Sequence, residues 1–173
     1  MRKVIHGEAV TLRPITYEDT DLIVKWRNNE RVRQNFIYRG MLTKEIHRHW
    51  MDTLVAHGSV VQYIIEYDGR PVGSVYYRNI DLENRSAEFG IFIGEDDAVG
   101  NGVGTEATRL FLDFGMNELM LHRICLRLLP HNKSAYRLYV SAGFRTEGIF
   151  REMAYIDGKY HDVIFMAILN QDY

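Results

Sequence analysis

The sequence predicts an α+β fold with a mixed, mostly antiparallel central sheet of about seven strands, flanked by about four helices. Stretches with strand periodicity and stretches with helical periodicity follow one another in an irregular order, unlike the strict alternation of a parallel α/β fold. The chain has 173 residues, of which 46% are apolar, enough for one hydrophobic core without disulfides. No repeat, linker or low-complexity segment divides it, so we expect a single domain over residues 1–173.

The first third of the chain predicts one strand and two amphipathic helices. Residues 8–15 alternate as a strand does, and residues 16–19 have the form of a capping box. A helix is therefore expected from there to about Asn28. Thr43 is a suitable cap for a second helix, which ends near residues 57–58.

The middle of the chain changes to strand periodicity. Residues 60–67, 72–77 and 87–93 are predicted strands. An Asp-Gly turn separates the first two, and a polar turn at residues 83–85 separates the second from the third. This spacing predicts an antiparallel meander.

The last part alternates between helices and strands. A buried helix is predicted over residues 103–119, a strand over 123–129 and a short helix over 132–142, which Gly143 ends. Two further strands are expected, one near residues 144–155 and one near 160–169, on either side of an Asp-Gly turn.

Composition excludes several classes of partner. The formal net charge of −2 gives no basic surface for nucleic acid or an anionic membrane, so neither is expected as a partner. Cys125 is the single cysteine, which rules out a disulfide within the chain. No apolar run reaches the ~20 residues of a membrane span, and we expect a cytoplasmic protein.

A glycine-rich segment connects the third meander strand to the buried helix. Three glycines at alternate positions allow the backbone to turn tightly and to approach a ligand closely. The helix that follows begins with unpaired amides and the positive end of its dipole, which favours a diphosphate. The residues predicted to bind it are Gly100, Asn101, Gly102, Val103, Gly104 and Thr105.

Two common phosphate-binding loops do not fit this spacing. A nucleotide-hydrolase loop requires Lys followed by Ser or Thr after its last glycine, and here Gly104 is followed by Thr105 and Glu106. A dinucleotide-binding loop requires Gly-x-Gly-x-x-Gly and an acidic residue about 20 positions later, and both features are missing. The pyrophosphate loop of acyl-coenzyme A transferases remains.

Here the sequence resembles the GNAT family of N-acetyltransferases, whose loop reads Gln/Arg-x-x-Gly-x-Gly/Ala. Val99 stands at the Gln/Arg position. Residues 132–144 resemble a second family segment, Asn-x-x-Ala-x-x-x-Tyr-x-x-x-Gly-Phe, and the predicted order of elements agrees with the GNAT fold over nearly the whole chain. The resemblance implies acetyl transfer from acetyl-coenzyme A, as acyl donor, to a primary amine.

This second segment supplies the candidate general acid, Tyr139. A phenol beside the departing thiolate would give it a proton, although a tyrosine on the inner face of a short helix is often only part of the core. Asn132 is both a good helix cap and, by resemblance, a contact to coenzyme A. The resemblance extends the coenzyme A contacts to Ala135 and Tyr136.

The third meander strand supplies the candidate base, because the attacking amine must lose a proton at neutral pH. Glu88 is that candidate, with Gly90 leaving room on the same face, and the alternative is an edge carboxylate paired with Arg85. By resemblance, backbone groups of Ile91, Phe92 and Ile93 bind the pantetheine arm and polarise the acetyl carbonyl.

The acceptor side is predicted around the first helix. Trp26, Arg27, Asn28 and Phe36 are richer in aromatic and basic character than a helix end requires, and they should border the acceptor cleft. No metal site is expected, because His47 and His49 point to different sides of a helix and are expected in solvent.

The identity of the acceptor stays open. Different segments resemble acetyltransferases of nucleotide-linked amino sugars, of spermidine and of ribosomal-protein N-termini. A small-molecule amine, an amino sugar or a polyamine, is expected; the alternatives are a protein N-terminus or a non-catalytic coenzyme A-binding module. Five basic residues between positions 27 and 44 favour an anionic or neutral acceptor. The aromatic-rich last strand pair suggests a possible homodimer.

Overall fold

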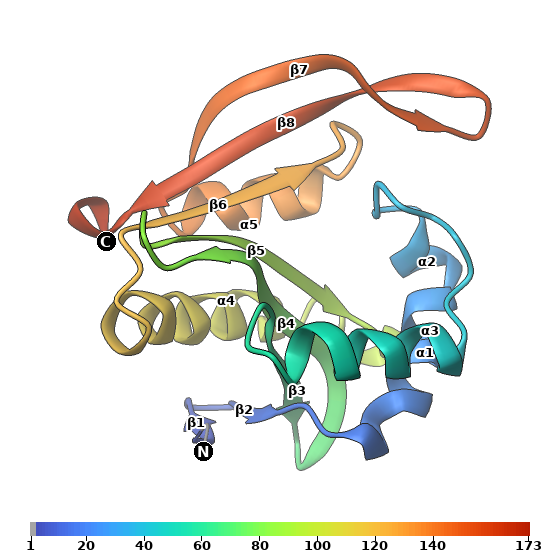
Figure 1. Cartoon of the computed structure of the whole chain (residues 1–173), viewed down its shortest axis with the longest axis vertical. Helices are drawn as coiled ribbons and strands as arrows, with labels where there is room; N and C mark the ends of the chain where they lie inside the picture. The colour runs from blue at the N-terminus through green and yellow to red at the C-terminus, as the bar shows by residue number, and fades with distance from the viewer. Residues whose placement is uncertain (1–2) are drawn as a thin grey trace.

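The computed structural model describes residues 3–173, in which eight strands form one sheet in the order β1-β2-β3-β4-β5-β6-β8-β7 (Figure 1). Neighbouring strands in this described part are antiparallel, with the exception of the parallel pair β5 and β6. The strands are β1 (Ile5–His6), β2 (Val10–Pro14), β3 (Val61–Tyr67), β4 (Arg70–Asp81), β5 (Ser86–Ile93), β6 (Arg123–Leu128), β7 (Arg145–Ile156) and β8 (Lys159–Leu169).

Five α-helices accompany the sheet within residues 3–173. They are α1 (Thr20–Asn28), α2 (Glu30–Arg33), α3 (Lys44–Trp50), α4 (Val103–Asp113) and α5 (Lys133–Ser141). Helices α1 to α3 gather at one end of the molecule, whereas α4 and α5 run along the strands (Figure 1). The predicted α+β class and mixed sheet are confirmed.

The differences from the predicted elements are local. The additional strand, β1, has two residues, too short to leave a periodic signal. The additional helix, α2, exists because Asn29 takes an extended conformation that ends α1, while its side chain accepts a hydrogen bond from the Arg31 amide. The expected long helices continue from α3 and α4 as wider π turns to Val55 and Glu118.

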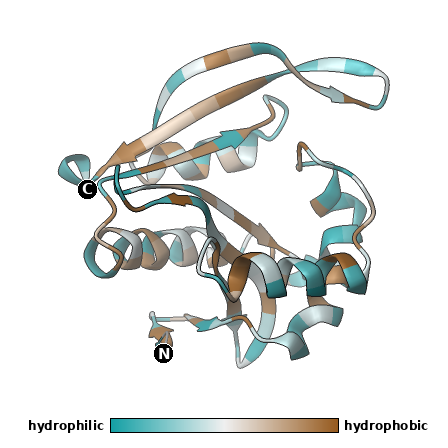
Figure 2. Ribbon diagram, in the orientation of Figure 1, coloured by the Kyte–Doolittle hydropathy of each residue, from teal (hydrophilic) through white to brown (hydrophobic). Residues whose placement is uncertain are grey.

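Two hydrophobic clusters fix the helices to opposite faces of the sheet. The larger cluster contains Phe111 of α4, whose ring stacks on Tyr77 of β4 with centroids 4.5 Å apart. The smaller contains Trp26 of α1 together with Ile64 and Phe92 of the sheet. Figure 2 shows the matching pattern, with apolar and polar segments alternating around α4.

The sheet divides at the parallel pair. Residues 86–88 of β5 lie beside residues 123–125 of β6, and beyond them the two strands share no register although both continue. Strands β5 and β6 therefore diverge like the arms of a fork. The glycine-rich segment and α4 follow the end of one arm, and α5 follows the end of the other.

Candidate active site

A cavity of about 490 Å³ opens at this fork, between the sheet and helices α1 and α3. Its walls come from β3, β4, β5, β6, α1, α3, α5 and the segment after α2. The predicted residues Arg27, Phe36, Glu88, Asn132 and Tyr139 all line it. Segments that are more than 100 residues apart in sequence thus meet in one site.

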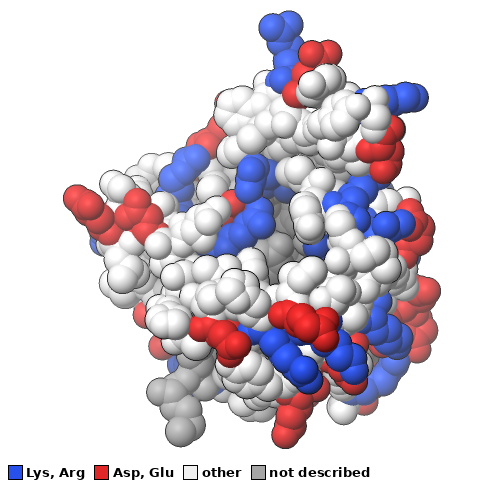
Figure 3. Space-filling view, turned by 45° about the vertical axis from the view of Figure 1, so that its right-hand side comes forward, with Lys and Arg blue, Asp and Glu red and all other residues white. Residues whose placement is uncertain are grey.

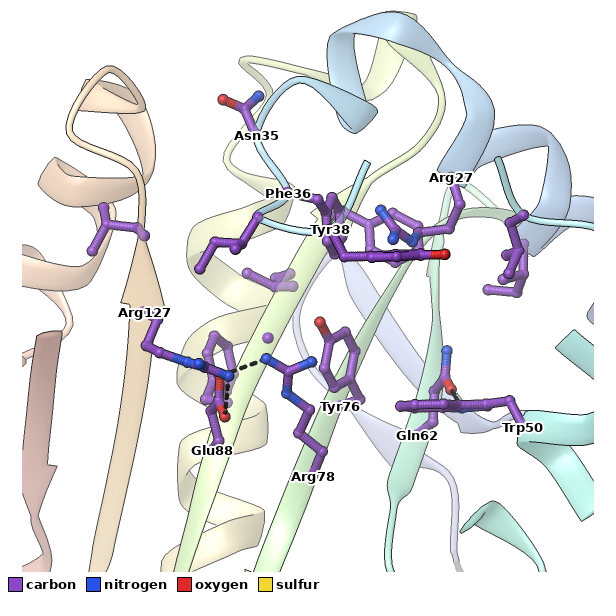
Figure 4. A pocket seen from close by; sticks show the side chains of 18 of the residues that line it. Arg27, Asn35, Phe36, Tyr38, Trp50, Gln62, Tyr76, Arg78, Glu88 and Arg127 are labelled. Atoms are coloured by element: carbon purple, nitrogen blue, oxygen red, sulfur yellow. Dashed lines mark hydrogen bonds and ion pairs between the residues drawn. The ribbon is translucent and has the colours of Figure 1, made fainter. Parts of the chain in front are cut away.

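Glu88 lies at one wall of the cavity, held by two arginines (Figure 4). Its Oε1 accepts hydrogen bonds from Arg78 Nη2 at 2.7 Å and from Arg127 Nε at 2.9 Å. Its Oε2 accepts from Asn79 Nδ2 at 3.0 Å and from Arg127 Nη2 at 3.1 Å. Both carboxylate oxygens are therefore fully engaged with the protein. The expected alternative partner, Arg85, is not among these donors.

This arrangement makes Glu88 a weak base. Burial raises the pKa of the Glu88 carboxyl, but the hydrogen bonds and charges of Arg78 and Arg127 outweigh burial and bring it below its ordinary value of 4.5. A carboxylate with a lowered pKa has little affinity for the proton of an amine. The geometry thus argues against the predicted role of Glu88 as the direct base and favours a role in holding the two arginines.

Gly90 was predicted to leave empty space beside Glu88, but a tyrosine ring fills that space. The ring of Tyr76 from β4 lies against Gly90, where a Cβ atom would meet its phenol. Tyr76 lines the cavity between the Glu88 group and the α1 side (Figure 4). Gly90 therefore makes room for this tyrosine.

Tyr139 of α5 reaches the cavity through the fork. Its ring makes an edge contact with Phe89 and a tilted contact with Phe144, and only 7% of the residue is exposed. Burial raises the pKa of the Tyr139 phenol, so the hydroxyl keeps its proton at neutral pH. A protonated phenol in a cavity has the chemistry that a general acid requires.

The free edge of β5 beyond the fork presents backbone groups. The amide of Gly94 donates to the Val72 carbonyl on the β4 side, whereas the carbonyl of Ile93 accepts from Arg31 on the other side. Because backbone groups alternate along a strand, those of Ile91 and Ile93 face away from β4 and those of Phe92 face toward it. Ile91 and Ile93 are therefore suited to pair with an extended ligand, whereas Phe92 is suited to contribute its side chain.

The glycine-rich segment has the geometry of an anion cradle. Gly100 and Gly102 have φ of 85° and 79°, in the left-handed region that favours glycine, and Gly102 is the N-cap of α4. The first described backbone bond of the helix goes from the Glu106 amide to the Gly102 carbonyl. The amides of Val103, Gly104 and Thr105 precede that bond and are available to an anion.

Replacing Gly102 with alanine is expected to lower the free energy of unfolding by about 1–2 kcal/mol, because an L-residue pays that cost in the left-handed region. The same change should weaken coenzyme A binding. Gly148→Ala is the matched control, since Gly148 has no positive φ and an added Cβ meets no atom within 4 Å. Urea unfolding and calorimetric titration measure both effects; equal losses in the two variants would contradict the strain argument.

Other predicted donor-side residues divide into two groups. Asn132 caps α5 by accepting from the Ala135 amide at 3.2 Å and also lines the cavity, so its two expected roles are compatible. Gly104 lies against Leu138 of α5, so the start of α4 packs beside α5. Tyr136 is 37% exposed and its hydroxyl is 3.3 Å from the Thr146 hydroxyl, away from the cavity wall. Asn101 donates to the Asp97 carbonyl and braces the loop.

The four predicted acceptor residues also divide. Arg27 and Phe36 line the cavity, with the Arg27 guanidinium carbon 3.3 Å from the centre of the Phe36 ring. Trp26 does not: it is fully buried, and its indole donates to Glu95 at 2.7 Å. Asn28 exchanges two hydrogen bonds of 2.8 Å with the Leu42 backbone. Trp26 and Asn28 therefore support the wall that Arg27 and Phe36 form.

Several cavity residues were missed by the sequence reasoning. His47, expected in solvent, is 2% exposed and lines the cavity, because α3 packs against α1. Its Nδ1 is 3.1 Å from the Thr20 hydroxyl, whose own proton goes to the Tyr17 carbonyl, so Nδ1 carries the proton. Burial lowers the pKa of His47, which leaves the ring neutral at pH 7.

Figure 3 shows lysine and arginine side chains gathered around a hollow on this side of the molecule.

Arg78 could have been found from the predicted meander, whereas Arg127 could not. Arg78 is the register partner of Glu88 on β4, and Arg127 lies two positions beyond Cys125, the partner of Glu88 on β6. The sequence shows the alternation of each strand, but the parallel pairing that brings Arg127 to Glu88 is set by the three-dimensional fold.

No group of His, Cys, Asp and Glu able to hold a metal occurs among residues 3–173. None of the described helices is long and apolar enough to cross a membrane.

Comparison with known proteins agrees with this geometry. The family model described as "Acetyltransferase (GNAT) domain" matches residues 9–145. The chain is 28% identical over 167 residues to spermidine N(1)-acetyltransferase of Escherichia coli K12, covering 96% of this chain and 89% of that one. It is 30% identical over 107 residues to a putative ribosomal N-acetyltransferase of Bacillus subtilis, covering 62% and 58% of the two chains.

A solved structure extends the likeness to the complete fold. The spermidine N-acetyltransferase of Vibrio cholerae in complex with coenzyme A and spermine superposes with a TM-score of 0.90 at 27% identity, over 96% of this chain and 99% of that one. A fork in the sheet, a glycine-capped helix beside it and a family match over most of the length lead to one conclusion. The chain belongs to the GNAT family of acetyltransferases.

Proposed function

We propose that this protein moves the acetyl group of acetyl-coenzyme A to the primary amine of a small molecule. The observation that carries the proposal is the free edge of β5, which leads directly to the glycine-capped start of α4 and has Tyr139 across the fork. These features fit an extended thioester with a diphosphate at one end. The relatives that act on spermidine support the small-molecule class of acceptor.

The chain's own groups account for most of the transfer. The amide and carbonyl of Ile91 and the amide of Ile93 align the pantetheine arm, and the amides of residues 103–105 bind the diphosphate. The neutral amine attacks the thioester carbon, so a C–N bond forms and the C–S bond breaks. Tyr139 gives its proton to the departing sulfur, the new ammonium loses a proton to water, and the Tyr139 phenolate takes a proton back from water. Glu88 keeps Arg78 and Arg127 in place.

Release of free thiol from acetyl-coenzyme A in the presence of a panel of primary amines tests this function. We expect thiol release that depends on the amine and yields an N-acetylated product, identified by mass spectrometry. Acetylation of peptide N-termini with no small amine accepted would favour a protein acceptor instead. Binding of coenzyme A with no acceptor of either kind would favour a non-catalytic module.

Acetyl-coenzyme A is also expected to stabilise the fold. At a free concentration a hundredfold above its dissociation constant, it should raise the free energy of unfolding by ~2.7 kcal/mol through mass action. A pantetheine thioester without the diphosphate should stabilise much less, because it leaves the start of α4 unfilled. Equal stabilisation by both ligands would contradict the role given to the glycine-rich segment.

A homodimer through the β7–β8 arm is a further part of the proposal. This arm extends past the rest of the sheet (Figure 1) and exposes several large apolar side chains. They are Ile149, Phe150, Met153, Tyr155 and Tyr160. Light scattering measures the mass directly, and a monomer at micromolar concentration would contradict this part. Cytoplasmic localisation stays a prediction.

A further inference from the structure

The acceptor side of the cavity contains three arginines and one carboxylate. Arg27, Arg78 and Arg127 line it together with Glu88, and the oxygens of Glu88 are already used by Arg78, Arg127 and Asn79. His47 also lines the cavity, but its imidazole is neutral at pH 7 and adds no positive charge. The lining thus has a positive excess and offers no free carboxylate to a second ammonium group.

Arg27 differs from the other two arginines because it has no carboxylate partner. Its Nη1 atom is buried and makes no hydrogen bond, whereas Arg78 and Arg127 are both paired with Glu88. The Phe36 ring holds the guanidinium in place from one side. Burial lowers the pKa of Arg27; Tyr76 opposes this effect, and the charge of Arg78 adds to it. A partly buried guanidinium without a counter-ion is costly, and an anionic ligand would offset that cost.

The position of Arg27 matches that of an anchor for the acceptor. Figure 4 shows its guanidinium at the wall across from the Glu88 group, with Tyr76 between the two. Two more buried polar atoms of the lining have no partner, Arg78 Nε and His47 Nε2. Nδ1 of His47 carries the proton, so its Nε2 is a hydrogen-bond acceptor. Arg78 Nε carries a hydrogen and is a donor. The wall therefore presents groups for a polar, anion-bearing molecule.

We propose that the acceptor is a primary amine that also carries an anionic group, a carboxylate or a phosphate, which Arg27 binds. This inference rests on the proposed function and narrows its substrate class. Arg27 acts on specificity: it holds the anion at one side of the cavity while the amine of the same molecule reaches the fork beside Tyr139. The wall selects against polycations, which would meet three guanidinium groups and no free carboxylate.

Matched pairs of amines test the charge preference. The pairs are 6-aminohexanoate with its carboxamide and glucosamine 6-phosphate with glucosamine, and spermidine serves as the polycation. We expect kcat/KM to be at least about 10-fold higher for the anionic member of one pair, because a hydrogen bond to a charged group usually contributes that much to binding. A difference within the 6-aminohexanoate pair would show that Arg27 binds a carboxylate, and a difference within the glucosamine pair would show that it binds a phosphate.

Variants of Arg27 connect the preference to this residue. Arg27→Met keeps an unbranched apolar side chain beside Phe36 and removes the charge, and should lower kcat/KM about 10- to 100-fold for the anionic member only. Arg27→Lys should retain a large part of the preference. Arg48→Gln, an exposed position of α3 outside the cavity, is the control and should change neither member.

The outcomes separate this inference from the proposed function. If neutral amines or spermidine are acetylated as well as the anionic members, or if Arg27→Met lowers both members equally, the inference is wrong and the acetyltransferase function stands. Calorimetry with coenzyme A and the N-acetylated acid or amide gives a readout without turnover. Binding of the acid that depends on Arg27, with no amine acetylated, would keep the anion-binding role of Arg27 and overturn the acetyltransferase function.

Discussion

Replacing Tyr139 with phenylalanine is expected to lower kcat by about 100- to 10,000-fold, the usual contribution of general acid catalysis. The KM for acetyl-coenzyme A should change little, because the lost hydroxyl acts on the departing sulfur in the transition state. Coenzyme A has a thiol-like pKa of about 8.5, so its sulfur leaves better when it is protonated. Burial raises the pKa of Tyr139, so the phenol carries its proton at neutral pH but is a weaker acid than a free tyrosine.

Steady-state kinetics with the accepted amine measures this effect. Tyr155→Phe, a change of the same kind on the exposed part of β7, is the control and should leave kcat unaltered. The variant protein should bind coenzyme A with the affinity of the wild type. Wild-type kcat in Tyr139→Phe would assign the proton to water and leave Tyr139 as part of the core.

Replacing Glu88 with glutamine is expected to lower the free energy of unfolding at pH 7 by about 1–3 kcal/mol. The change leaves Arg78 and Arg127 without their counter-ion, but their side chains are 35% and 26% exposed, so water screens part of the cost. Glu147→Gln, which removes an exposed ion pair with Arg123, is the control and should cost less than about 1 kcal/mol.

The same comparison has a defined pH dependence. The pKa of Glu88 is lowered in the folded protein, so its stabilising contribution is complete above its unfolded value of 4.5. As pH falls below 4.5 and through the folded pKa, Glu88 is protonated and the contribution is lost. The stability difference between wild type and Glu88→Gln should therefore shrink below pH 4.5. A difference that stays constant down to pH 3 would show that the arginine pairing does not stabilise the fold.

The activity of Glu88→Gln shows whether Glu88 acts as a base or only holds Arg78 and Arg127 in place. Because Glu88 is ionised throughout pH 6–9, we expect the ratio of variant to wild-type kcat/KM to be constant over that range. A ratio that rises toward one at high pH, where neutral amine is abundant, would restore Glu88 as the base.

The sequence was most informative where chemistry and local backbone geometry coincide. The glycine spacing predicted the start of α4, because positive φ at Gly100 and Gly102 is a local requirement. Tyr139 was predicted from the resemblance of residues 132–144 to a family segment, and Asn132 also from its capping role, which the structure shows. The glycines and the cap depend on neighbours within a few positions, which backbone and capping rules describe.

The acceptor wall was harder to predict because it forms between distant segments. Trp26 has the composition of a binding residue, but α1 packs it into the core, where only its indole N–H has a polar partner. His47 looked solvated from its spacing, and the packing of α3 on α1 buries it. Arg127 reaches Glu88 only through the parallel pairing of β5 and β6.

The fork also has a consequence for the solubility of the protein. An unpaired strand edge is a template on which other chains can add and aggregate. Here the open edge of β5 lies inside the molecule, where α1 and α2 stand on one side and α5 on the other. Arg31 donates to the carbonyls of Ile93 and Gly94, so the exposed end of this edge is occupied by a charged side chain. The molecule can thus keep an incomplete sheet for a small ligand while denying it to a neighbouring strand.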